Sequence, residues 1–515
     1  MKTHLGVVIL LALLSSRAAG ETPEQLYEAA FGAETKAVLV TRATDDDLTL
    51  AAKLLAQARE ATGPAYRALL CGKAARVACI ASEGLILIEE SIKLLAEVAP
   101  ADRAAGEECL GGACDALCRR FTEGDTGLKA NTLLLRAALV VGDGQAGRGL
   151  YEVAARTFAG ASRLASAQNC PLRHLLDEKA GLAKARGEVE KRLTRFRDRL
   201  VASSKDTQAA RILGLTHLTD LDDPTGARGY LEKAGTDPEM LPLLDLAVKA
   251  PGELADEDCQ KLGNWYADLA AKSGPLGKFK CLARASACCR RRLELLNVLD
   301  PKYEETRRAM ERLTADTAQA QGALCDGWIN LMPTIDPVLD ALPNKLWKVT
   351  EEGLSKPFGS QALIMIPYQA PVEYDFEVSF TCSTQQQPVG AICPINGRPF
   401  AVLVGDDNNT MCRIEHFIGH SGDQKKTERQ LKLAENRRYV LCVQVRRNSI
   451  TALLDGVQIL KHWTDGSDLN TSARWVIPNA KALGFGAYRD AAVFHSAYVR
   501  EVTGNGKFVP HPEKK

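Results

Sequence analysis

The segment Glu373-Tyr374-Asp375-Phe376-Glu377-Val378-Ser379-Phe380 decides the fold of the second half of the chain. Its aromatic and aliphatic residues occupy every second position, and acidic residues and a serine occupy the positions between them. Successive side chains of a β-strand point to opposite faces, so this alternation predicts a strand with one buried apolar face and one polar face. The second half is therefore expected to be a β-domain.

Two hairpins are predicted downstream of this strand. The run 439–445 (YVLCVQV) is followed by Asn448-Ser449 and the run 450–454 (ITALL), and Asp455-Gly456 then leads into 457–460 (VQIL). Short turn dipeptides between strand-like runs are typical of hairpins. With further strand patterns at 483–488 and 493–499, roughly ten to twelve strands are expected at the spacing of a β-sandwich.

Upstream of the β-domain, from about residue 24 to 322, apolar residues recur every three or four positions, which predicts an all-helical region. Leu175, Leu182, Val189 and Phe196 are seven residues apart and predict one long helix of about 30 residues. The predicted fold class is therefore α followed by β, with an antiparallel β-sandwich after the helices.

Helices between residues 206 and 322 come in pairs that carry small and large apolar residues at similar offsets. The residues concerned are Ala227, Tyr230, Leu231 and Ala234, then Leu262, Gly263, Trp265, Tyr266 and Leu269, then Leu282, Ala283, Ala285, Cys288 and Leu293. Small residues let two helices approach closely, and stacked pairs bury a continuous core. This part resembles tetratricopeptide (TPR) or related helical-hairpin repeats, which implies a protein-binding scaffold.

The N-terminus has the pattern of a signal peptide. Lys2 precedes the apolar run Leu5–Leu14, and Ala18-Ala19-Gly20 supplies small residues for cleavage. The run is about half the length needed to cross a bilayer. Export is therefore expected, to the periplasm, the cell surface or the extracellular space, with no transmembrane segment in the mature chain.

These patterns divide the chain into six parts. The expected parts are 1–20 (signal peptide), 21–205 (helical region), 206–322 (TPR-like repeats), 323–343 (linker), 344–508 (sandwich) and 509–515 (flexible tail). The linker assignment rests on Asp336-Pro337 and Pro343-Asn344, which interrupt the helical period.

Charge and cysteine content limit the function further. Without Lys2 and Arg17, 63 of the 65 basic residues remain against 64 acidic ones, which gives about −1. Such a balance provides no general attraction to nucleic acid, so no nucleic-acid partner is expected. The fifteen cysteines show no clean metal-binding spacing, and Cys114, Cys118, Cys281 and Cys288 are interpreted as small buried hydrophobes on helices.

Four segments of the second half resemble the laminin-G/concanavalin-A-like sandwich. They are Trp347–Leu354 (WKVTEEGL), Glu373–Phe380 (EYDFEVSF), Arg438–Ile459 (RYVLCVQVRRNSITALLDGVQI) and Leu483–Val502 (LGFGAYRDAAVFHSAYVREV). The resemblance is to the version found in secreted bacterial proteins related to the 3-keto-disaccharide hydrolase family, and it covers residues 344 to 508. The whole arrangement is similar to secreted bacterial proteins with a helical half, and it implies a scaffold joined to a recognition module.

Glu373, Asp375 and Glu377 are the candidate catalytic residues. They share one face of the predicted strand and resemble the E-x-D-x-E signature of concanavalin-A-like β-glucanases, in which one carboxylate attacks the anomeric carbon and another protonates the leaving oxygen. The alternative is an acidic, solvated strand face. We favour a protein that is not an enzyme, with a glycoside-active enzyme as one alternative and a structural envelope component as another.

Two groups of residues are candidate metal ligands, although no cofactor is required. Asp406, Asp407 and Asn408 form an oxygen-rich turn suited to Ca²⁺, or simply a hairpin turn that tolerates positive φ. His416 and His420 next to Glu415 could share a metal if they lay on a helix, but Gly419 and the strand context favour a loop.

Trp463, Trp475, His462 and Arg474 are the candidate ligand-binding residues, because an indole face can stack on the apolar face of a sugar ring. The competing interpretation is that the tryptophans belong to the core. The sequence thus predicts an exported, non-catalytic recognition or scaffold protein whose helical half binds protein and whose sandwich binds a glycan or a protein.

Overall fold

The computed structural model describes residues 21–41, 43–168, 170, 172–235, 239–342, 346–359, 361–383, 388–415 and 427–511. These residues form two compact units, Met1–Ala165 and Ser166–Lys515. The predicted signal peptide, 1–20, lies outside the described residues. The predicted fold class is confirmed, because helices occupy the chain up to Leu324 and two antiparallel sheets follow.

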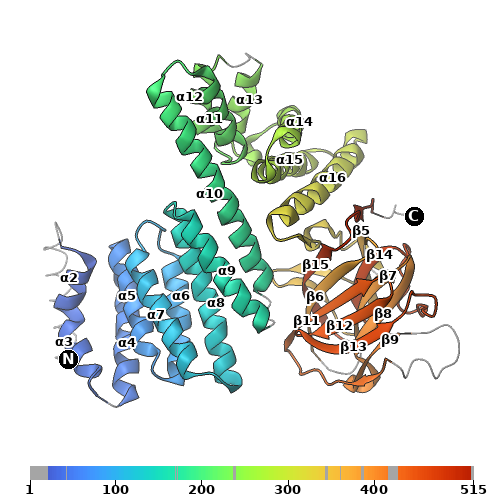
Figure 1. Cartoon of the computed structure of the whole chain (residues 1–515), viewed down its shortest axis with the longest axis horizontal. Helices are drawn as coiled ribbons and strands as arrows, with labels where there is room; N and C mark the ends of the chain where they lie inside the picture. The colour runs from blue at the N-terminus through green and yellow to red at the C-terminus, as the bar shows by residue number, and fades with distance from the viewer. Residues whose placement is uncertain are drawn as a thin grey trace. The chain divides into compact units, whose positions relative to one another are not determined.

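The first unit consists of helices packed side by side (Figure 1). They are α2 (Pro23–Tyr27), a π-helical turn (Glu28–Gly32), α3 (Ala33–Val38), α4 (Thr44–Glu60), α5 (Pro64–Ala78), α6 (Leu85–Ala96), α7 (Ala104–Arg120), α8 (Gly124–Gly147) and α9 (Tyr151–Ala167). A buried ion-pair network tightens this unit: Glu107 accepts from Arg103 Nε at 2.8 Å and from Arg148 Nη2 at 2.6 Å.

The second unit begins with α-helices whose ends follow local sequence signals. They are α10 (Arg173–Ala202), α11 (Thr207–Thr219), α12 (Pro224–Lys233), α13 (Met240–Ala247), α14 (Asp256–Lys272), α15 (Pro275–Leu295) and α16 (Pro301–Leu324). Asp206, Asp223 and Asp300 cap α11, α12 and α16 by accepting backbone N–H groups. The predicted 30-residue helix is confirmed as α10.

The sandwich of the second unit contains two sheets, here named sheet A and sheet B. Sheet A has the order β13-β12-β11-β6-β15-β4-β3, and β1 also pairs with β15; sheet B has the order β10-β9-β8-β7-β14-β5-β16, and β2 also pairs with β5. The strands of sheet A are β1 (Trp328–Asn330), β3 (Lys348–Thr350), β4 (Gly353–Lys356), β6 (Tyr374–Cys382), β11 (Arg438–Arg446), β12 (Ser449–Leu454), β13 (Val457–Trp463) and β15 (Ala492–Glu501).

Sheet B is assembled from the remaining strands. They are β2 (Ala341–Leu342), β5 (Ala362–Gln369), β7 (Val389–Ile395), β8 (Arg398–Gly405), β9 (Met411–Glu415), β10 (Arg429–Gln430), β14 (Ala482–Ala487) and β16 (Lys507–Phe508). The two predicted hairpins are confirmed, since β11 pairs with β12 and β12 with β13.

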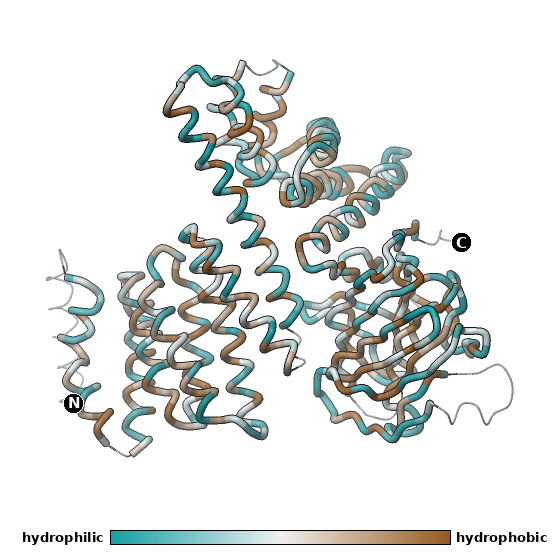
Figure 2. The backbone as a smooth tube through the Cα atoms, viewed as in Figure 1, coloured by the Kyte–Doolittle hydropathy of each residue, from teal (hydrophilic) through white to brown (hydrophobic). Residues whose placement is uncertain are grey.

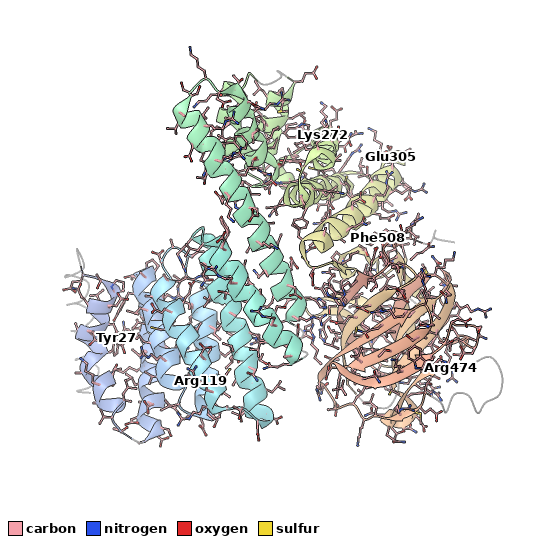
Figure 3. All side chains as sticks on the ribbon, viewed as in Figure 1. Tyr27, Arg119, Lys272, Glu305, Arg474 and Phe508 are labelled. Atoms are coloured by element: carbon pink, nitrogen blue, oxygen red, sulfur yellow. The ribbon has the colours of Figure 1, made fainter. Side chains whose placement is uncertain are left out.

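The core of the sandwich lies between the sheets, and hydrophobic residues are frequent along its strands (Figure 2). Tyr374, Phe376, Val378 and Phe380 are all essentially buried in it, so the predicted apolar face of this strand is confirmed. Phe485 and Phe494 stack with ring centroids 4.4 Å apart, and Trp347 meets both edge-on. Phe508 (Figure 3) packs edge-on against Tyr368.

The predicted linker, 323–343, contains short strands that pair with both sheets of the sandwich. Trp328–Asn330 pairs with Arg500, Val499 and Tyr498 at one edge of sheet A, and Ala341–Leu342 pairs with β5 of sheet B. The helical period ends there as predicted, but the segment forms edge strands because Trp328 and Ile329 are apolar and become buried. The two units divide at 165/166, so α10 belongs to the same unit as the sandwich.

The cysteines in the described residues are all free thiols. Burial raises the pKa of Cys114 and Cys281 to about 12, which keeps both thiols protonated. The interpretation as buried small hydrophobes is confirmed for Cys114, Cys281 and Cys288, whereas Cys118 is only half-buried. Among the described helices, none is long and apolar enough to cross a membrane.

The C-terminal segment is anchored by His511, whose Nδ1 lies 2.8 and 3.0 Å from the two carboxylate oxygens of Asp340. Burial alone would lower the pKa of His511, but the hydrogen bond and charge of Asp340, with Glu311 and Asp336 nearby, outweigh it and raise the pKa. At least residues 509–511 of the expected flexible tail are therefore held, since Val509 also donates to Pro367.

This anchor predicts a pH dependence of stability. A histidine with a raised folded pKa contributes stability below its unfolded pKa of about 6.5 and loses it as the pH rises through the folded value. Between pH 6 and 9 we expect the melting temperature of the wild type to fall more than that of His511→Gln. Parallel melting curves for the two proteins in thermal denaturation would contradict the anchor.

Candidate functional site

The outer face of sheet A brings together residues from six strands in straight rows. In one row, Lys461 pairs with Thr451, Thr451 with Gln444, Gln444 with Asp375, Asp375 with Arg500 and Arg500 with Trp328. The neighbouring row contains Leu453, Cys442, Glu377 and Tyr498. This face therefore carries the candidate catalytic carboxylates, and it divides into two halves of different character.

The first half is built around Asp375, of which only 1% is exposed. Arg446 Nη2 donates to one carboxylate oxygen at 2.8 Å, and Arg500 Nη2 donates to the other at 2.7 Å. Two guanidinium groups thus match this single carboxylate. Such charge-assisted pairs are strong in a buried setting and fix both partners.

Glu377 is 5% exposed, and its carboxylate is paired with two side chains from the first turn of α10. Arg173 Nη2 donates to one oxygen at 2.8 Å, and His174 Nε2 lies 2.6 Å from the other. Burial alone would raise the pKa of Glu377, but the hydrogen bonds and charges of His174 and Arg173 outweigh it and lower the pKa. Glu377 is thus held as a carboxylate.

Aromatic rings complete this half, which we call the covered half. The His174 ring stacks on Tyr498 with centroids 3.9 Å apart and meets Trp328 edge-on. The guanidinium groups of Arg173 and Arg500 lie 5.1 and 5.0 Å from the centroid of Trp328. A small hollow beside His174, lined also by Glu178, Gln321 and Tyr498, has room for about one water and not for a sugar.

The other half of the face remains open, and we call it the open platform. It consists of Trp463 and Lys461 on β13, Thr451 on β12, and Gln444 and Arg446 on β11. Trp463 is 67% exposed, and the Lys461 ammonium lies 4.4 Å from its ring centroid. An indole, a hydroxyl, an amide and two cationic groups are therefore presented side by side on rigid strands.

The four predicted ligand-binding residues do not form one site. Trp475 is only 1% exposed and packs against Leu403 and Gly390 on the outer face of sheet B, so its indole cannot meet a ligand. Its assignment as a ligand residue is wrong, and its interpretation as a core tryptophan holds. The chain crosses from sheet A to sheet B between β13 and β14, which separates Trp475 from Trp463.

Arg474 and His462 are also separated from Trp463. The Arg474 guanidinium (Figure 3) lies 5.0 Å from the ring centroid of Tyr488, beside sheet B. His462 pairs with the inward-facing Ile450, and its Nε2 lies 2.8 Å from Asp468 Oδ2. Because neighbouring strand residues point to opposite faces, His462 cannot share a face with Trp463.

The candidate metal ligands serve the local turn. Asp407, Asn408 and Asn409 have positive φ values of 47°, 57° and 62°, as the hairpin-turn interpretation expects. Asp406 pairs with Arg413 at 2.7 Å, and Asn409 exchanges hydrogen bonds with the backbone of Leu433. Calcium binding at this turn stays a prediction, and His416 and His420 lie outside the described residues.

Sequence reasoning missed four of the five platform residues. The two-residue turn Arg447-Asn448 pairs Arg446 with Ser449, and the register then pairs Gln444 with Thr451. The predicted turn, Asn448-Ser449, lies one residue too late, and a shift of one residue changes which side chains of β11 and β12 share a face. By contrast, Arg173 and Glu377 are about 200 residues apart, and no local pattern announces their contact.

Solved structures that resemble the chain cover about a third of it. No family model matches the chain, and no curated protein matches it. Among solved structures, a carbohydrate-binding module from Bacillus subtilis is 12% identical and covers 34% of this chain and 96% of its own, with a TM-score of 0.23.

Two further solved structures cover a similar share of the chain. A protein with a galectin-like fold from Bacillus subtilis is 10% identical and covers 30% of this chain and 86% of its own, with a TM-score of 0.23. A galectin from Caenorhabditis elegans is 12% identical and covers 28% of this chain and 94% of its own, with a TM-score of 0.20. At TM-scores this low, the function has to be argued from the residues of this chain.

Proposed function

We propose that this chain is a non-catalytic glycan-binding protein that recognises its ligand on the open platform of sheet A. The observation that carries the proposal is Trp463, an indole 67% exposed on a regular strand. An exposed indole suits the apolar face of a sugar ring, and the platform adds the polar groups that sugar hydroxyls need. Thr451 and Gln444 both donate and accept hydrogen bonds, and Lys461 and Arg446 donate.

The covered half supports a non-catalytic role. A glycosidase needs one carboxyl group with a raised pKa as general acid and a second carboxylate open to the sugar. Here Asp375 is held between two arginines, and the pKa of Glu377 is lowered by His174 and Arg173. Both carboxylates are buried, so neither is presented to a substrate. Glu373, the third candidate, accepts the backbone N–H of Arg447 at 3.2 Å.

The proposal extends to the setting and to the helices. Export, expected from the N-terminal pattern, would bring the platform to glycans outside the cytoplasm. For the helical region we propose a protein-binding role, supported by helices that pack as successive pairs, α11 with α12 and α14 with α15.

Substitution of Trp463 tests the proposal. We expect Trp463→Ala in the full chain to weaken glycan binding at least about tenfold, or about 1.4 kcal/mol, because the stacking surface is lost. Binding is measured on a glycan array and then by titration with the glycans that bind.

The matched control is Phe358→Ala, which removes an aromatic side chain that is 66% exposed, on the same sandwich but off the platform. This variant should bind as the wild type does. Equal binding by Trp463→Ala and the wild type, or no binding to any glycan by the wild type, would contradict the proposal.

A further inference from the structure

We infer that the open platform binds the end of a glycan chain and not an internal segment. This inference rests on the proposed function and adds the kind of ligand. It follows from what lies at the two ends of the row that contains Lys461, Thr451 and Gln444.

The row is open at the strand edge and closed in the middle of the sheet. It begins at Lys461 on β13, the last strand of sheet A on that side. Across β12 and β11 it stays accessible. Asp375 then lies beneath the guanidinium groups of Arg446 and Arg500, whose side chains are 33% and 41% exposed, and the row ends at Trp328, which is 8% exposed and lies under Arg173. A ligand that follows the row from the β13 side meets these two arginines and can go no further than Trp328.

The first turn of α10 closes the other side. Arg173 reaches down to Glu377 and to the Trp328 ring, and His174 lies flat on Tyr498. Both side chains come from the first turn of α10, which therefore stands above Glu377 and Trp328. An extended polymer lying along the row would collide with Arg173 at the Trp328 end.

The open part of the row has the size of a short oligosaccharide. Neighbouring strands are about 4.8 Å apart, which is close to the length of one sugar ring, so β13, β12 and β11 offer room for about three sugar residues. We assign the outer position to stacking on Trp463 and the inner position, on the side of α10, to Gln444 and Arg446.

The carboxylates of the face do not favour a cationic ligand. Asp375 is matched by Arg446 and Arg500, and Glu377 by Arg173, so neither carboxylate is left to hold a cation. The charge of Arg446 is shared with Asp375 and the Lys461 ammonium lies over the Trp463 ring, and the remaining N–H groups of both side chains can donate to sugar hydroxyls. Hydroxyl groups of a neutral glycan match the remaining donors and acceptors without leaving a buried charge unpaired.

Oligosaccharides of increasing length test this inference. The full chain is titrated with laminari-, cello-, malto- and xylo-oligosaccharides of two to six residues, and with the corresponding polymers before and after limited hydrolysis at equal mass. We expect affinity to rise up to about the trisaccharide and then to stay within about twofold. Hydrolysis should raise the number of sites per mass in proportion to the chain ends created.

The possible outcomes separate the two proposals. If affinity keeps rising to six residues and hydrolysis leaves the number of sites per mass unchanged, the platform binds internal segments, and this inference falls while glycan binding stands. If none of the oligosaccharides or polymers binds, the end-binding inference is overturned together with the proposed function. Loss of the trisaccharide affinity in Trp463→Ala, with Phe358→Ala unchanged, would attribute the length dependence to the platform.

Discussion

Glu377→Ala is expected to lower the free energy of unfolding of the second unit by about 3–5 kcal/mol. The substitution leaves Arg173 and the buried His174 without their carboxylate, and an uncompensated buried charge is costly. The contact joins α10 to β6, so the loss should also loosen the packing of the helix on sheet A. Chemical denaturation monitored by tryptophan fluorescence measures the effect, because Trp328 lies within this cluster.

Glu373→Ala is the matched control, on the same strand face but only half-buried. Its side chain accepts one backbone N–H at 3.2 Å, and we expect its removal to cost less than about 1 kcal/mol. In a double-mutant cycle, the stability losses of Glu377→Ala and Arg173→Ala should not be additive, because the two side chains form one ion pair. Equal stability of Glu377→Ala and Glu373→Ala would show that the ion pairs of the covered half do not stabilise the fold.

Trp475→Ala is expected to destabilise the sandwich by about 3–5 kcal/mol, the usual cost of removing a large buried aromatic side chain. Trp475 covers the outer face of sheet B together with Leu363, Met365 and Ile477. Its loss leaves a cavity over this face. The indole packs so closely on the backbone of Gly390 that a Cβ added there would lie 2.6 Å from it. Thermal denaturation of the full chain measures the change.

The other tryptophan of the predicted pair provides the comparison. Trp463→Ala removes an exposed side chain, so its free energy of unfolding should stay within about 0.5 kcal/mol of the wild type. The two substitutions should therefore separate cleanly, one affecting stability and the other affecting binding. A stability loss in Trp463→Ala as large as that of Trp475→Ala would contradict this division.

The sequence predicted what depends on local periodicity. The alternation in Glu373–Phe380 placed Phe376 in the core and Glu377 on the opposite face, and the seven-residue spacing from Leu175 predicted α10. Both follow from the geometry of a single element, which side-chain period alone determines.

The sequence did not reveal what depends on contacts between distant segments. Glu377 reads as a solvent-facing acid on its own strand, and only the docking of Arg173 and His174 makes it buried and paired. Trp463 and Trp475 are close in sequence, but the crossing from sheet A to sheet B carries them to different faces. Their separation depends on the topology of the whole sandwich.

Oxidative footprinting of the full chain, with and without a saturating neutral oligosaccharide, tests most directly whether the open platform is the binding surface. Hydroxyl radicals oxidise exposed aromatic side chains, and mass spectrometry gives the rate for each one. Our account predicts that the ligand slows oxidation of Trp463 several-fold and leaves Phe358 unchanged. Saturated binding with Trp463 oxidised at its free rate would contradict it.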